Sequence, residues 1–146
     1  SRFDDASFDL ALSIHAMRYV ADIERAMSEA ARVLRPGGVL AVSVPHPADQ
    51  MFSDSAPYRA ERSYFSQRTP YIDWNWDEEK FGGSGRLRDW RRTVSEWFDL
   101  FGNAGFTVER LVEPYGGDMS AEDAEWYDME RVHLMPHVLI IKARKR

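Results

Sequence analysis

The sequence contains no cysteine and no long hydrophobic run, and each absence excludes a class of function. Without cysteine, the 146 residues can form no disulfide, thiolate nucleophile or thiolate metal site, and a reducing cytoplasm is the expected location. No apolar run reaches the roughly 18 residues that cross a bilayer, so no membrane partner is expected. The net charge of −5 disfavours nucleic acid, whose phosphates it would repel. The length and the 44% hydrophobic content predict a single domain over residues 1–146.

Motifs for metal binding and nucleophilic catalysis are also scarce. His133 and His137 have the spacing of a helical ligand pair, but Pro136 lies between them, so no metal site is expected. No Gly-x-Ser-x-Gly elbow is present. The "GGSG" of residues 82–85 precedes no helix, so it is not a phosphate-binding loop.

The first third of the chain has the pattern of a strand, a helix and a second strand. "FDLALSI" at 8–14 is apolar on both faces, which predicts a strand buried on both sides. Asp22 is a suitable N-cap for an amphipathic helix that we expect to end at Gly37 or Gly38, after Pro36. "VLAVSV" at 39–44 predicts a second buried strand.

Two strands joined by one helix are expected to pair in parallel through a right-handed crossover. Their carboxyl ends then meet at one edge of the sheet, where open α/β sheets bind ligands. We therefore expect Ser13, Ile14 and His15 to lie beside Pro45 and His46.

Residues 48–89 lose this periodicity and are rich in aromatic side chains, which is typical of a lid or binding loop. A hairpin is predicted around "GGSG". The alternative is that these rings only pack the segment onto the body of the domain.

Regular structure returns at Thr93, which with Glu96 forms a predicted capping box, and the helix is expected to close at Gly105. Two further strands are predicted, "FTVERLV" at 106–112 and "HVLIIKA" at 137–143. The expected core stripe of the helix consists of Val94, Trp97, Phe98 and Phe101.

The order of these parts carries a resemblance. "SFDLALSIHAMRYVADIERAMSEAARVLRPGGVLAVSVPHP" resembles the central segment of class I S-adenosylmethionine-dependent methyltransferases, where an "FD" strand precedes a helix ending in "LRPGG" or "LKPGG". "WRRTVSEWFDLFGNAGFTVERLVEP" and "HVLIIKARKR" resemble the segments that complete that fold in the small-molecule branch called methyltransferase type 11. The resemblance implies an α/β, Rossmann-like sheet of the family's strands 4-5-7-6, with the last strand antiparallel and an aromatic-rich lid.

The largest departure from the family is the loss of its cofactor-binding motifs. The family's Asp/Glu-x-Gly-x-Gly loop and its ribose-binding acid are missing, so the chain resembles the C-terminal part of such an enzyme. The strand at 8–14 would then be an exposed apolar edge. Either a separate N-terminal half is supplied, or the edge is covered by a second copy in a homodimer or by the aromatic-rich segment 48–89.

The resemblance also implies a cofactor, S-adenosylmethionine, and its site. Ser13, Ile14 and His15 match the loop that lines the methionine and sulfonium end of the cofactor. Arg18 and Tyr19 match an "HY" pair, and Arg18 could bind the cofactor carboxylate.

On the acceptor side, His46 is the candidate catalytic base, with strand-end capping as the alternative role. Trp74, Trp76 and Arg92 are the candidate substrate-binding residues, and relatives commonly have His in place of Arg91. Two hypotheses follow: methyl transfer to a small-molecule acceptor by a parent enzyme of which this chain is an inactive part, or a non-catalytic binding or dimerisation module.

Overall fold

The computed structural model describes residues 2–65, 71–75, 84–125 and 128–146. Its centre is a four-stranded sheet in the order β1-β2-β6-β5. The strands are β1 (Phe8–Ile14), β2 (Leu34–Pro45), β5 (Phe106–Val112) and β6 (Val138–Lys145). β1 and β2 are parallel, whereas β6 runs antiparallel to both of its neighbours. This is the strand order and direction that the resemblance implied.

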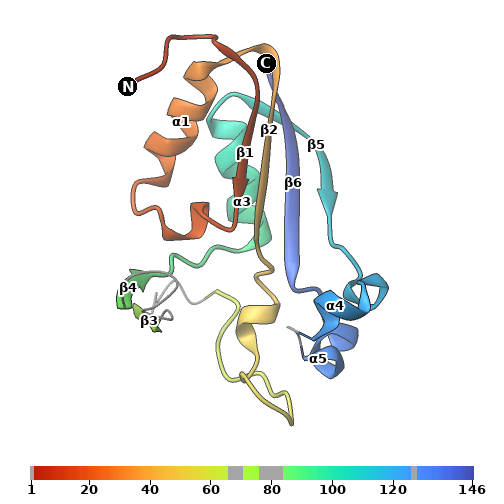
Figure 1. Ribbon diagram of the computed structural model, residues 1–146. Helices are drawn as coiled ribbons and strands as arrows, with labels where there is room; N and C mark the ends of the chain where they lie inside the picture. The colour runs from red at the N-terminus through yellow and green to blue at the C-terminus, as the bar shows by residue number, and fades with distance from the viewer. Residues whose placement is uncertain (1, 66–70, 76–83, 126–127) are drawn as a thin grey trace.

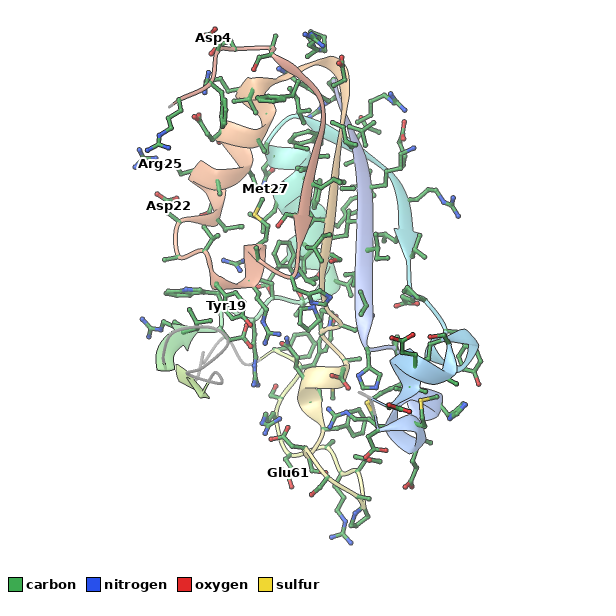
Figure 2. The ribbon with its side chains drawn as sticks, in the orientation of Figure 1. Asp4, Tyr19, Asp22, Arg25, Met27 and Glu61 are labelled. Carbon is green, nitrogen blue, oxygen red and sulfur yellow. The ribbon has the colours of Figure 1, made fainter. Side chains whose placement is uncertain are left out.

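Helices α1 (Ile23–Val33) and α3 (Val94–Asn103) cover the same face of this sheet. Met27 of α1 points toward the strands (Figure 2) and is fully buried. It shares the core with Trp97 and Phe101 of α3 and with alternate residues of the strands, namely Leu40, Val42, Val44, Leu139, Ile141 and Ala143. Alternation of period two therefore places every second side chain of β2 and β6 against the helices.

The helix ends follow the capping chemistry of the sequence. Asp22 accepts a hydrogen bond from the Arg25 amide at 3.1 Å and caps α1. Thr93 and Glu96 form the predicted capping box of α3, and Gly105 follows the helix in the left-handed conformation, with φ of 89°. The predicted stripe is wrong at Phe98, which is 51% exposed.

The end of α1 also differs from the prediction. The helix stops at Val33, before Pro36, and β2 begins at Leu34. Pro36 cannot donate to the carbonyl of Arg32, and its ring clashes with that carbonyl in a helix. The next two glycines belong to the strand, and a Cβ on Gly38 would lie 2.9 Å from the carbonyl oxygen of Arg35.

The opposite face of the sheet is apolar and uncovered by the described residues. Its side chains on β1 are exposed: Phe8 by 38%, Leu10 by 53%, Leu12 by 63% and Ile14 by 75%. The expectation that this strand is buried on both sides is therefore wrong for the described part of the chain. β1 is also the edge of the sheet, as the departure from the family pattern implied.

The remaining segments gather around the end of the sheet where β1 and β2 finish (Figure 1). They are residues 46–65, the hairpin of β3 (Tyr71–Asn75) and β4 (Ser84–Arg88), and the short helices α4 (Ala121–Ala124) and α5 (Met129–Leu134). The predicted antiparallel hairpin is confirmed, but Ser84 and Gly85 of "GGSG" belong to β4, so the turn is not centred on that motif. The connection at 76–83 lies outside the described residues.

Two phenylalanines of α3 provide a stability test. Phe101→Ala removes a fully buried ring and should lower the free energy of unfolding by about 3–5 kcal/mol. Phe98→Ala changes an exposed ring in the same helix and should cost no more than about 0.5 kcal/mol. Urea unfolding of both variants measures the difference, and equal losses would contradict the orientation of α3.

Candidate functional site

The carboxyl ends of β1 and β2 bring the predicted site residues to one edge. Ser13 pairs with Val42, and Ile14 pairs with Ser43. The His15 amide donates to the carbonyl oxygen of Ser43 at 3.0 Å, and His15 turns the chain away with φ of 52°. His46 follows β2 directly. The expected parallel pairing is confirmed, but the register places Ser13, Ile14 and His15 beside Val42 and Ser43, so that Pro45 and His46 extend beyond the end of β1.

The imidazole of His46 is held on both nitrogens and is only 5% exposed. The Ala48 amide donates to Nδ1 at 3.1 Å, which requires an unprotonated Nδ1. The proton of the neutral ring is therefore on Nε2, which lies 2.8 Å from Oε1 of Glu113. Neither nitrogen offers a free lone pair in this arrangement. The bond from the Ala48 amide is the kind of backbone contact that the alternative role, capping of the strand end, requires. Its role as a base stays a prediction.

Arg18 lies in the short 3-10 turn that follows β1, and its guanidinium forms an ion pair with the carboxylate of Asp89. Nε is 2.9 Å from Oδ1, and Nη2 contacts Oδ2. The carboxylate is only 1% exposed. The backbone joins the same two segments, because the Trp90 amide donates to the carbonyl oxygen of Arg18 at 2.8 Å. The guanidinium also lies 5.3 Å from the ring centroid of Tyr19.

The position of Arg18 affects its neighbour at the end of β1. The pKa of His15 is lowered, first by burial and then by the charge of Arg18. His15 is therefore held neutral at pH 7.

Arg131 of α5 fastens the segment that follows β2. Its side chain reaches Asp49 Oδ1 at 2.8 Å, the carbonyl oxygen of Asp49 at 2.9 Å and that of Ser53 at 2.6 Å. Nδ1 of His137 lies 3.3 Å from the same Asp49 oxygen. Sequence reasoning missed this cluster, because Asp49 and Arg131 are 82 residues apart and no local pattern links them. The N-cap Asp128 was the one local signal that a helix begins just before Arg131.

Of the three predicted substrate-binding side chains, Arg92 is the one that lies within the described structure. Trp74 lies in β3 opposite Gly85, but its side chain, like all of Trp76, lies outside the described residues. Arg92 donates to the carbonyl oxygen of Trp90 at 3.0 Å and lies 5.3 Å from the ring centroid of Trp97. It lines a pocket of about 410 Å³ between the beginnings of α1 and α3.

The described residues also bear on metal binding and on membrane spanning. In residues 2–65, 71–75, 84–125 and 128–146, no group of three or more His, Asp or Glu side chains is placed to hold a metal ion. No helix within the same ranges is long and apolar enough to span a bilayer.

Comparison with known proteins identifies the fold. The chain is similar to a structure from Listeria monocytogenes that is described as an S-adenosylmethionine-dependent methyltransferase. The two superpose with a TM-score of 0.74 at 19% identity, over 100% of this chain and 65% of that one. The chain has the class I methyltransferase fold. An S-adenosylmethionine-dependent methyltransferase from Mesorhizobium loti gives a TM-score of 0.67 at 23% identity, over 98% of this chain and 64% of that one. The chain thus spans slightly less than two thirds of either structure.

Sequence comparison supports the same assignment at the N-terminal end. A family described as "Methyltransferase domain" matches residues 1–42 of this methyltransferase-fold chain. A sterol 4-C-methyltransferase of Caenorhabditis elegans is 42% identical over 36 residues, which are 25% of this chain and 11% of that protein. Both matches therefore cover short stretches, and the family match lies in the region of β1 and α1.

The pKa of His15 provides a test of the site's electrostatics. Its folded-state pKa lies below the ordinary value of 6.5, so the unfolded chain binds the proton more readily. The stability contribution of His15 is complete above 6.5 and is lost as the pH falls through the folded-state pKa. NMR titration of the imidazole should show the lowered midpoint, and Arg18→Gln should bring it part of the way back toward 6.5.

The matched control is Arg25→Gln, an exposed arginine of α1 that is not among the causes of the shift. A His15 midpoint of 6.5 or higher in the unmodified chain would contradict the environment described.

Proposed function

We propose that this chain forms the acceptor-side part of an S-adenosylmethionine-dependent methyltransferase that acts on a small molecule. The observation that carries the proposal is the strand order β1-β2-β6-β5 with an antiparallel β6, which brings the segment after β1 and the segment after β2 to one ligand-binding edge. S-adenosylmethionine supplies an activated methyl group on its sulfonium when bound. The protein then has to bind, align and dehydrate the two reactants.

The residues at the end of β1 fit one end of such a cofactor. Ser13, Ile14 and His15 occupy the carboxyl edge, and His15, held neutral, brings no positive charge against a sulfonium. We propose that these three residues, with Arg18 and Tyr19 behind them, line the methionine and sulfonium end. Because Arg18 already donates to Asp89, it can bind the cofactor carboxylate only if its guanidinium contacts both carboxylates or gives up the bond to Asp89.

A further segment of methyltransferase fold is needed to complete this site. The sequence has no Gly-rich loop of the family type and no acid positioned after a preceding strand to bind the ribose. The apolar outer face of β1 is open, and the hydroxyl of Ser43 on the same face is buried without a hydrogen-bond partner among the described residues. We propose that a segment carrying the cofactor-binding strands covers this edge and face. The greater length of the Listeria and Mesorhizobium structures supports this proposal.

The acceptor is proposed to enter beside β2 and the segment 48–89, which serves as a lid. His46, Trp74, Trp76 and Arg92 are the proposed acceptor-side residues. As a base, His46 would have to release the Ala48 amide to free Nδ1. The short match to a protein named as a sterol methyltransferase supports a small organic acceptor and no particular one. A cytoplasmic location remains part of the proposal.

Cofactor binding is the direct test. Calorimetric titration of the full-length protein that carries this chain with S-adenosylhomocysteine should show binding. His15→Ala should weaken it about threefold to tenfold, as expected for the loss of one packing or hydrogen-bond contact.

His133→Ala is the matched control, since His133 is an exposed histidine of α5 and should leave the affinity unchanged. No heat of binding from the unmodified protein would refute the proposed function. Equal affinities for all three proteins would instead refute the role of His15 alone.

A second candidate function is favoured by the exposed edge. A non-catalytic module could use β1 to bind a second copy of this chain, because an uncovered apolar strand is a template for pairing. Light scattering on the full chain should then give the mass of a dimer, and Leu12→Lys on the exposed face should give the monomer. A monomer before the substitution would count against this candidate.

A further inference from the structure

Asp89 is the centre of a buried charge cluster in which the cations outnumber the carboxylates. Arg18 occupies both oxygens of Asp89. Arg91 forms an ion pair with the same carboxylate, but its Nε is 3.8 Å from Oδ2, beyond hydrogen-bond distance. One carboxylate that is 1% exposed therefore faces two guanidinium groups, each on a side chain that is only 17% exposed.

Arg91 is the cation with the weaker hold on Asp89. Its Nε is buried and has no hydrogen-bond partner among the residues described here, and its ion pair with Asp89 at 3.8 Å shares a carboxylate that Arg18 already contacts at both oxygens. The pKa of Arg91 is lowered, first by burial; Asp89 and Asp54 oppose this shift by attraction, and Arg62 and Arg18 add to it by repulsion. A charge removed from water is costly where its pairing is incomplete, and buried polar groups in folded proteins nearly always have a hydrogen-bond partner, whether protein, water or ligand.

The neighbouring arginines do not share this property. Arg92 lines the same pocket as Arg91, but it donates to the Trp90 carbonyl and covers the Trp97 ring. Arg62 donates to the Phe52 carbonyl at 2.9 Å and lies 3.5 Å from Asp54. Of these three arginines, Arg91 is the one whose Nε is buried without a hydrogen-bond acceptor in the described structure.

The backbone holds Arg91 at the ligand-binding edge. On one side, the Trp90 amide is bonded to Arg18, which follows β1 by four residues. On the other side, Thr93 begins α3 with its capping box, and the Val94 amide bonds the Tyr64 hydroxyl at 3.0 Å. The guanidinium is therefore held near the carboxyl end of β1, where the positive charge of Arg62, in the segment 48–89, repels it.

From this geometry we infer that Arg91 binds a carboxylate of the acceptor, which anchors the acceptor at the end of β1 and β2. The inference rests on the proposed function and specifies its substrate class as an organic acid. A guanidinium presents a planar fork of N–H donors that matches a carboxylate, and charge-assisted bonds of this type are strong where water is excluded. A bound carboxylate would also bring the cluster of Arg18, Arg91 and Asp89 to neutrality.

The test compares benzoate with benzamide, which has the same shape without the charge. Thermal unfolding of the full chain should show a higher melting temperature in millimolar benzoate, since a ligand of the folded state stabilises it, and a smaller shift in benzamide. Arg91→Met should raise the melting temperature without ligand, because it removes an incompletely paired buried charge, and should abolish the benzoate shift. By calorimetry, benzoate affinity should fall at least about tenfold in this variant.

Arg91→Lys keeps the charge without the planar fork and should retain only part of the benzoate shift. Arg35→Gln, at the opposite end of the sheet and paired with Asp9, should behave as the unmodified chain. A lower melting temperature of Arg91→Met with an unchanged benzoate shift would overturn the inference and assign Arg91 a structural role. A shift with inorganic phosphate and none with benzoate would overturn the assignment to an acceptor carboxylate.

S-adenosylhomocysteine titration of the same variants separates this inference from the proposed function. If the protein binds the cofactor and Arg91→Met leaves benzoate binding unchanged, the role of Arg91 as an acceptor anchor is refuted and the methyltransferase proposal stands. If benzoate binding depends on Arg91 but the protein does not bind the cofactor, the carboxylate site stands and the methyltransferase proposal is refuted.

Discussion

The parallel pairing of β1 with β2 is the interaction on which the other features depend. It joins two strands that α1 separates in sequence, and the crossover leaves both carboxyl ends at one edge. β2 also pairs along its other side with β6, so its backbone is satisfied on both sides and its side chains supply the centre of the core. A slip of one residue in the β1–β2 register would turn the side chains of β1 to the opposite faces of the sheet and displace His15 from Ser43.

The local elements were predictable from sequence because their determinants are local. The N-cap at Asp22, the capping box of Thr93 and Glu96, and the alternation of β6 are each encoded within a few residues. The strand order came from the resemblance to the methyltransferases, not from the pattern of any one segment. The end of α1 was misjudged because the glycine stop signal was given more weight than the effect of Pro36 on the preceding turn.

The contacts of the site were much less predictable. Arg18 with Asp89 and Arg131 with Asp49 join residues 71 and 82 positions apart, and the sequence has no periodicity that links them. The same is true of His46, whose two nitrogens are taken by a backbone amide and by a carboxylate 67 residues away. The sequence predicted that His15 and His46 lie at the carboxyl edge of the sheet, but it did not predict which charged side chains there pair with one another. That distinction separates Arg91 from Arg18 and Arg92.

The three bonds of Arg131 have a consequence for how the molecule opens. They tie the turn at Asp49–Met51 to α5, so neither segment can leave the body without breaking the anchor of the other. The backbone bond from His46 to His137, at 2.8 Å, adds the beginning of β6 to the same unit. We therefore expect amide hydrogens in the two segments to exchange with solvent through one shared opening event, so that the turn, α5 and the beginning of β6 form a single cooperative foldon.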